Sequence, residues 1–217
     1  MVEAASVTTP DLYVFDLDGT LVDSLPDIAD ALNHAMTEAH FAARTLLEIR
    51  AFLGDGAREL VRRAVGPAPS EDALTELVAA YRARYRTALV NKTRPYPGVL
   101  ATLPQLRAPA AVLTNKPGPE AREIVLGTGM SAWLPKVVGE GDGLPRKPDP
   151  ESLRTLVRDA GSVRPLYVGD SAVDEETAAR AGVDFVFVSF GYGEASAAAR
   201  RVARFEELLL VQAASAG

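Results

Sequence analysis

The chain has 217 residues, of which 47% are hydrophobic and 24% are charged, with a formal net charge of −6 and no cysteine. This is the composition of a globular protein whose length suits one full domain or a core with a modest insertion. The absence of cysteine excludes thiol nucleophiles, zinc–thiolate sites and disulfide frameworks, and it fits a reducing compartment. The acidic balance argues against nucleic acid or a membrane surface as a partner.

The sequence predicts neither a signal peptide nor a membrane span. Residues 1–9 include an acidic side chain and no apolar segment, so we expect no signal peptide. No apolar run approaches the ~20 residues of a membrane span. We therefore expect a cytoplasmic protein, and we expect residues 213–217 to fray.

Short apolar runs punctuate the chain, and the first, at residues 12–15, ends abruptly in acidic residues and glycine. This pattern predicts a buried strand followed by a turn. Similar runs follow at residues 111–113, 137–138, 166–168 and 185–188. Helical patterns at residues 151–160 and 174–181, each followed by glycine, separate the later runs. Strands that alternate with helices predict an α/β fold, a doubly wound parallel sheet covered on both faces.

Residues 26–90 differ from the rest because nearly all of their apolar residues recur with a helical period. Glycine and proline interrupt this block, and Ser70 can cap its last helix. A helical block of this length is too long for one crossover helix, so we expect an inserted helical cap domain. We assign residues 10–24 and 95–217 to the α/β core domain and residues 25–94 to the cap domain.

Two carboxylates, Asp16 and Asp18, directly follow the first predicted strand. Residues two apart on an extended segment point the same way, so both side chains can face one pocket. One can then act as a nucleophile while the other, protonated, serves the leaving oxygen. Gly19 permits the tight turn that this needs. An isolated Asp-X-Asp is more often a plain turn, so this interpretation depends on the later strands.

The later strands end in residues suited to phosphate and metal. Thr114 and Asn115 can donate hydrogen bonds to phosphate oxygens, and Lys147 lies in a stiff, proline-rich segment that would hold its ammonium in place. The alternative for Thr114 and Asn115 is a polar turn without function, and the alternative for Lys147 is a solvated surface lysine. Asp170 and Asp174, next to Asp16, would form the oxygen-rich site that Mg²⁺ prefers. A nucleophile, a cation and a positive clamp together favour phosphoryl transfer.

Four stretches, in this order, resemble the four motifs of the haloacid dehalogenase superfamily. They are residues 16–24 (DLDGTLVDS), 114–117 (TNKP), 147–150 (KPDP) and 169–174 (GDSAVD). The resemblance implies a Rossmann-like core, with a helical (C1-type) cap where the helical block lies. It also implies that Asp16 is the nucleophile and becomes an aspartyl phosphate, and that Asp18 is the general acid and base.

The same resemblance implies roles for the residues of the other three motifs. Thr114 and Lys147 would hold the transferring phosphoryl group, with Asn115 adjacent. Asp170 would bind Mg²⁺, and Asp174 would support the metal or Lys147. Asp16 and the backbone carbonyl of Asp18 complete the implied metal site. The acid at position 18 excludes the dehalogenase branch of the superfamily.

Within the superfamily, the chain is most similar to phosphoglycolate phosphatases, in residues 15–33, 54–64, 93–100 and 189–193. We therefore expect a Mg²⁺-dependent phosphatase of a small phosphorylated metabolite, with 2-phosphoglycolate as the first candidate. A nucleotide, pyrophosphate or a sugar phosphate are alternative substrates, and a β-phosphoglucomutase-like phosphomutase is an alternative activity. A phosphonate hydrolase would need a cap lysine. The only cap-side lysine in the sequence is Lys92, which lies near the hinge, so the sequence argues against this activity. A non-catalytic binding protein would be expected to have lost some of the acids, and none is missing.

The cap offers two candidate substrate contacts. Gly56 lies in a glycine-rich loop between two cap helices, and Arg58 just beyond it could bind a second anionic group of the substrate. The alternative is that Arg58, Arg62 and Arg63 form a solvated helix face.

Overall fold

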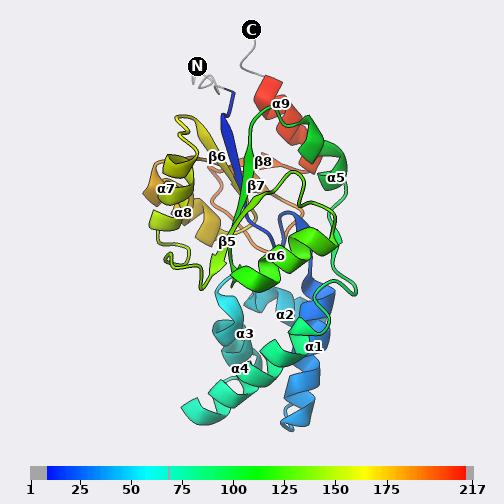
Figure 1. The fold of residues 1–217 in the computed structure, drawn as a ribbon. Coiled ribbons are helices and arrows are strands. Elements are labelled where there is room, and N and C mark those ends of the chain that lie inside the picture. Colours follow the sequence, from blue (N-terminus) through cyan, green and yellow to red (C-terminus); the bar gives the residue numbers. More distant parts are fainter. Residues whose placement is uncertain (1–8, 68, 214–217) are drawn as a thin grey trace.

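The computed structural model describes residues 9–67 and 69–213 (Figure 1). The segment before residue 9, for which we expect no signal peptide, lies outside this range, as does most of the C-terminal end that we expect to fray. Within the described part of the chain, no helix has both the length and the apolar character needed to cross a bilayer.

The core is a six-stranded sheet with the strand order β5-β4-β1-β6-β7-β8, and every neighbouring pair is parallel. The strands are β1 (Leu12–Phe15), β4 (Ala110–Pro117), β5 (Lys136–Glu140), β6 (Pro165–Gly169), β7 (Asp184–Val188) and β8 (Arg200–Val202). The predicted parallel α/β sheet is confirmed, and β8 is an edge strand that the sequence pattern did not predict.

Side chains alternate across the sheet, and helices cover both faces. In β1, Tyr13 and Phe15 point into one apolar cluster, whereas Leu12 and Val14 point into another. The helices α7 (Glu151–Asp159) and α8 (Ala172–Ala181) cover the face with Leu12 and Val14. The helices α5 (Val99–Thr102), α6 (Gly118–Gly127) and α9 (Leu208–Ala213) lie on the opposite side (Figure 1).

The predicted helical insertion consists of α1 (Leu25–Glu38), α2 (Leu46–Phe52), α3 (Gly56–Val65) and α4 (Glu71–Arg86). Ser70 caps α4 as predicted, because its hydroxyl accepts a hydrogen bond from the Ala73 amide at 3.2 Å. The insertion begins directly after β2 (Val22–Asp23) and ends before β3 (Arg94–Pro95), and these two short strands pair antiparallel. The division into domains of residues 10–24 with 95–217 and 25–94 stays a prediction.

The carboxyl ends of three adjacent strands, β4, β1 and β6, face the inserted helices (Figure 1). The chain reverses its winding direction at β1, since β4 and β5 lie to one side and β6, β7 and β8 to the other. Open parallel sheets bind ligands at such a switch point. The fold therefore places a binding site between the sheet and the helical insertion.

Candidate active site

Asp16 occupies the first position after β1. Its amide donates to the Val168 carbonyl on β6 at 2.9 Å, which fixes the backbone at the end of the strand. The carboxylate is buried, with Oδ1 2.8 Å from the Lys147 ammonium. Burial raises the pKa of Asp16, and the charge of Lys147 opposes that rise. Asp16 is therefore a desolvated carboxylate next to a fixed cation, the setting in which a carboxylate can serve as a nucleophile.

Asp18 lies in the turn that follows. Its Oδ2 is 2.9 Å from the Lys116 ammonium, and its Oδ1 accepts a hydrogen bond from the Ser24 hydroxyl. Gly19 has φ +87°, and a Cβ at this position would overlap the carboxylate of Asp170. The turn therefore requires glycine, as predicted, and it brings Asp18 close to two partners, Lys116 and Ser24, to which the sequence analysis gave no role.

Asp170 follows β6 and completes a group of buried acids. Oxygens of Asp16, Asp170 and Asp174 lie within 4.8 Å of one another. Burial raises the pKa of Asp170, and the neighbouring charges of Asp16 and Asp174 raise it further. The Tyr192 amide donates to Asp170 Oδ2 at 2.6 Å and the Thr20 hydroxyl to Oδ1 at 3.4 Å. Crowded carboxylates of this kind are stabilised when a divalent cation shares their charge, so the cluster could hold a metal ion.

Asp174 differs from its neighbours because hydrogen bonds already occupy both of its oxygens. Lys147 lies 2.7 Å from Oδ1, which also accepts from the Tyr167 hydroxyl at 2.8 Å. Oδ2 accepts from the Ser171 hydroxyl at 2.6 Å and from its amide at 3.2 Å. Of the two roles left open for Asp174, these contacts favour support of Lys147 over direct binding of a metal.

Lys147 reaches the site from the loop before α7. Burial lowers its pKa, but the carboxylates of Asp16 and Asp174 raise it by more, so the net shift is upward and the ammonium stays charged. Asn115 at the end of β4 holds the lysine backbone, because its side chain donates to the Lys147 carbonyl at 3.1 Å and accepts from the Lys147 amide at 2.9 Å. Thr114 is also buried and lines the same cavity. The predicted phosphate-binding residues are thus brought together.

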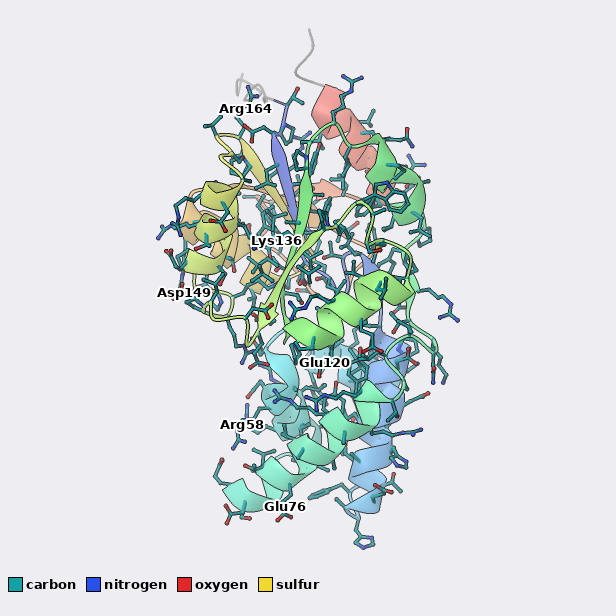
Figure 2. All side chains as sticks on the ribbon, viewed as in Figure 1. Arg58, Glu76, Glu120, Lys136, Asp149 and Arg164 are labelled. Atoms are coloured by element: carbon teal, nitrogen blue, oxygen red, sulfur yellow. The ribbon has the colours of Figure 1, made fainter. Side chains whose placement is uncertain are left out.

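A cavity of about 400 Å³ lies between the carboxyl ends of the strands and the cap helices. Asp174 does not line this cavity, whereas Gly56 from the cap does, together with the core residues Asp16, Asp18, Thr114, Asn115, Lys116, Lys147 and Asp170. Arg58 does not line it: the guanidinium is exposed and pairs with Glu71 and Thr75, on the outer side of the cap (Figure 2). The position of Arg58 therefore favours the alternative interpretation, a solvated helix face. Two other cap cations, Arg50 and Arg82, line the cavity instead.

Several contacts join the cap to the core around this cavity. Arg50 on α2 donates to the carbonyls of Gly191 and Tyr192, and the Asn115 side chain donates to the Gly54 carbonyl at 3.3 Å. Arg146 donates to the Asp55 carbonyl at 2.8 Å. The structure therefore shows the cap seated on the core.

Four residues of the site were missed or left without a role by the sequence analysis: Lys116, Ser24, Tyr192 and Arg50. Lys116 had a signal, since it is one of four lysines in the chain and follows Asn115 in a recognised motif. Tyr192 also lies in a stretch that carries the resemblance. Arg50 had no distinguishing signal, because the helical period of residues 26–90 does not show which arginine of the cap faces the core.

The parallel α/β core, the helical insertion and the buried acid–lysine cluster at the strand ends are the features that the resemblance implies for a hydrolase of the haloacid dehalogenase superfamily. Residues 13–188 match the family described as "Haloacid dehalogenase-like hydrolase". This chain belongs to that family.

Individual relatives agree with the family match. The chain is 41% identical over 189 residues to a phosphoglycolate phosphatase of Cereibacter sphaeroides, covering 84% of this chain and 86% of the relative. It is 39% identical over 195 residues to a phosphoglycolate phosphatase of Rhodospirillum rubrum, covering 84% and 81%. A crystal structure from Haemophilus somnus, described as a predicted phosphoglycolate phosphatase, superposes with a TM-score of 0.88 at 29% identity, covering 94% of this chain and 98% of the other. The prediction of a phosphatase of this superfamily is confirmed at the level of family and enzyme class.

Proposed function

We propose that this protein hydrolyses 2-phosphoglycolate through an aspartyl phosphate on Asp16, with Mg²⁺ as its cofactor. The observation that carries the proposal is the position of Asp16: a buried carboxylate at the end of β1, 2.8 Å from the Lys147 ammonium and lining the cavity between core and cap. Asp18 lines the same cavity, where it can exchange a proton with the leaving group.

The reaction divides into two steps. In the first, an oxygen of Asp16 forms a bond to phosphorus as the bond from phosphorus to the glycolate oxygen breaks, and Asp18 supplies a proton to that oxygen. In the second, Asp18 takes a proton from water, whose oxygen bonds to phosphorus and releases Asp16 and inorganic phosphate. Lys147 and Thr114 hold the phosphoryl oxygens through both steps, because their polar atoms are fixed before the substrate binds.

Asp16, Asp170 and the backbone carbonyl of Asp18 would hold Mg²⁺, with Asp174 orienting Lys147. The bound ion would neutralise charge on the phosphoryl oxygens and on the crowded acids. This assignment agrees with the crowding of Asp16 and Asp170, whose pKa values are raised even though the charge of Lys147 opposes the rise in both.

Two observations support a small substrate over the alternatives. The relatives at about 40% identity carry the name phosphoglycolate phosphatase. A cavity of about 400 Å³ is near the lower end of ligand-site volumes and suits a short phosphate ester better than a nucleotide. The cytoplasmic location and the absence of nucleic-acid and membrane partners stay predictions from composition.

The test is a phosphate-release panel with and without Mg²⁺. It includes 2-phosphoglycolate, a nucleotide, pyrophosphate and a sugar phosphate, with Asp16→Asn as the blank. We expect the highest kcat/KM for 2-phosphoglycolate, no turnover without the metal, and a loss of at least about 10³-fold in Asp16→Asn. Near wild-type turnover in Asp16→Asn would disprove the mechanism. Isomerisation of a sugar phosphate without phosphate release would show a mutase.

A further inference from the structure

Lys116 is a buried cation in the cavity that the mechanism does not use. It is only 9% exposed, and its ammonium lies 2.9 Å from Asp18 Oδ2. Burial lowers the pKa of Lys116, but Asp18, Tyr85 and Tyr81 together raise it by more, so the net shift is upward and the group is charged. Lys147 is already shared by two carboxylates, whereas Lys116 has an ion pair with Asp18 alone among the described residues.

The cap supplies the wall around this ammonium. The Tyr85 ring on α4 lies 4.7 Å from the Lys116 Nζ, and Tyr81 lines the same cavity one helical turn earlier. The Tyr85 hydroxyl is buried and has no hydrogen-bond partner within the described part of the chain. A charged donor and an unpartnered hydroxyl next to each other at this cavity indicate a place where an anionic group of a ligand is expected.

We propose that Lys116 determines substrate specificity: its ammonium binds the carboxylate of the substrate, so that the enzyme selects phosphate esters of short 2-hydroxy acids. This inference rests on the proposed function, in which Asp16 receives the phosphoryl group and Asp18 protonates the leaving oxygen. It assigns Lys116 the role that the sequence analysis had considered for Arg58.

The covalent structure of the substrate supports the assignment. For proton transfer, the leaving oxygen must lie about 2.6–3.2 Å from the Asp18 carboxyl. In 2-phosphoglycolate one methylene separates that oxygen from the carboxylate. An ester held with its bridging oxygen on Asp18 therefore carries its carboxylate into the space next to Asp18, and the ammonium of Lys116 is in that space, 2.9 Å from Asp18. A longer acid would carry its carboxylate past the lysine.

The two cap arginines that line the cavity are less suited to this role. Arg50 already donates to two backbone carbonyls of the core, those of Gly191 and Tyr192. Arg82 lies 3.3 Å from Glu140 Oε2, outside the acid cluster, although its Nε is buried without a hydrogen-bond partner among the described residues. Arg82 is therefore the competing candidate, and the test includes it.

The experiment compares three esters: 2-phosphoglycolate, ethyl phosphate, which lacks the carboxylate, and 3-phosphooxypropionate, which is one carbon longer. We expect wild-type kcat/KM for 2-phosphoglycolate to exceed that for the other two by about 30-fold or more, since a buried charge-assisted contact is worth about 2 kcal/mol. Lys116→Met should lose this preference, so that the ratio of kcat/KM for 2-phosphoglycolate to kcat/KM for ethyl phosphate falls by about 30-fold, whatever the common effect on Asp18. Lys92→Met, an exposed lysine paired with Asp30, is the matched control and should behave as wild type.

Equal losses on all three esters in Lys116→Met would overturn the inference, because they would show that the lysine only positions Asp18. Loss of the preference in Arg82→Gln, with Lys116→Met retaining it, would assign the carboxylate to Arg82. If Lys116→Met did not fold, as judged by circular dichroism, the chain-length series on the wild-type enzyme would still decide: equal kcat/KM for the three esters contradicts the inference. Phosphate release from all three esters would leave the proposed hydrolysis intact, whereas release from none would reject both.

Discussion

The Lys147 ammonium lies 2.7 Å from Oδ1 of Asp174, a side chain with no exposed surface. The same ammonium is 2.8 Å from Asp16 Oδ1, so one lysine bridges the proposed nucleophile and an acid on α8. Asp174 is itself fixed by Ser171, with which it forms the capping box of α8, and by the Tyr167 hydroxyl. The start of α8 thus determines where Lys147, the proposed phosphate-binding cation, lies.

This geometry predicts different defects for two neighbouring acids. Asp174→Asn should lower kcat by about 10- to 100-fold through misplacement of Lys147, with less than about a threefold change in the Mg²⁺ concentration for half-maximal activity. Asp170→Asn should instead raise that concentration by about 10-fold or more. The measurement is phosphate release as a function of Mg²⁺. Glu176→Gln, an exposed acid on α8, is the control; a matching rise in Mg²⁺ requirement for Asp174→Asn would assign Asp174 to the metal.

The raised pKa values of Asp16 and Asp170 predict that metal binding depends on pH. Each pKa is higher in the folded protein than its ordinary value of 3.8, so in the metal-free protein these groups contribute stability at low pH and lose it as pH rises through the folded pKa. A divalent cation must displace their protons. Its affinity should therefore increase with pH between 3.8 and the folded pKa values of Asp16 and Asp170, about 7 and about 8.

We therefore expect Mg²⁺ to raise the melting temperature more at about pH 8 than at about pH 5. Thermal melts with and without Mg²⁺ at both pH values measure this difference. Asp170→Asn should lose most of the Mg²⁺-induced rise at the higher pH. A rise of equal size at both pH values would show that Mg²⁺ binding is not coupled to these acids.

The sheet and the helical insertion could be predicted because both depend on local patterns. Short apolar runs of two to four residues indicate buried parallel strands where they alternate with helical patterns, and the period of residues 26–90 predicts helices regardless of how they pack. The edge strand β8 (Arg200–Val202) could not be predicted, since two of its three residues are exposed arginines. The strands β2 and β3 hold two residues each, too few for any period to show.

The candidate site, like the fold, could be predicted only in part from the sequence. Asp16, Thr114 and Asp170 follow apolar runs directly, so a parallel sheet brings them to one edge. The pairing of Lys116 with Asp18 was not predictable, because it depends on the register of β4 against β1 and on how the chain turns after Asp16. Which cap side chains reach the cavity depends on how the helices are seated, and a helical period gives only the apolar face of each helix.

The contact between Arg50 and the core predicts a role in cap closure. Arg50 donates to the carbonyls of Gly191 and Tyr192, and the Tyr192 amide in turn donates to Asp170. Arg50→Ala removes these bonds, so we expect kcat/KM for 2-phosphoglycolate to fall by about 5- to 50-fold. Steady-state kinetics measure the effect.

The matched control is Arg58→Ala. Arg58 is also a cap arginine, but it pairs with Glu71 away from the cavity, and we expect its removal to leave kinetics unchanged. A loss in Arg58→Ala as large as that in Arg50→Ala would restore the prediction that Arg58 contacts the substrate.

The buried carboxylate of Asp27 on α1 predicts a position where loss of one polar side chain destabilises the fold. Only 2% of Asp27 is exposed, and its Oδ2 accepts from the Lys92 amide at 2.8 Å and from the Thr93 amide and hydroxyl at 2.7 and 2.8 Å. These bonds join the start of α1, where the chain enters the cap, to residues 92–93, where the chain returns to the core.

Asp27→Ala would leave three donors without their acceptor in a buried site, so we expect a loss of about 3 kcal/mol in the free energy of unfolding. Urea denaturation followed by circular dichroism measures the loss. Asp30 lies three residues after Asp27 on α1 and forms only an exposed ion pair with Lys92. Asp30→Ala should therefore change the free energy of unfolding little. If Asp27→Ala were as stable as Asp30→Ala, packing of the helices, and not this carboxylate, would hold the two connections together.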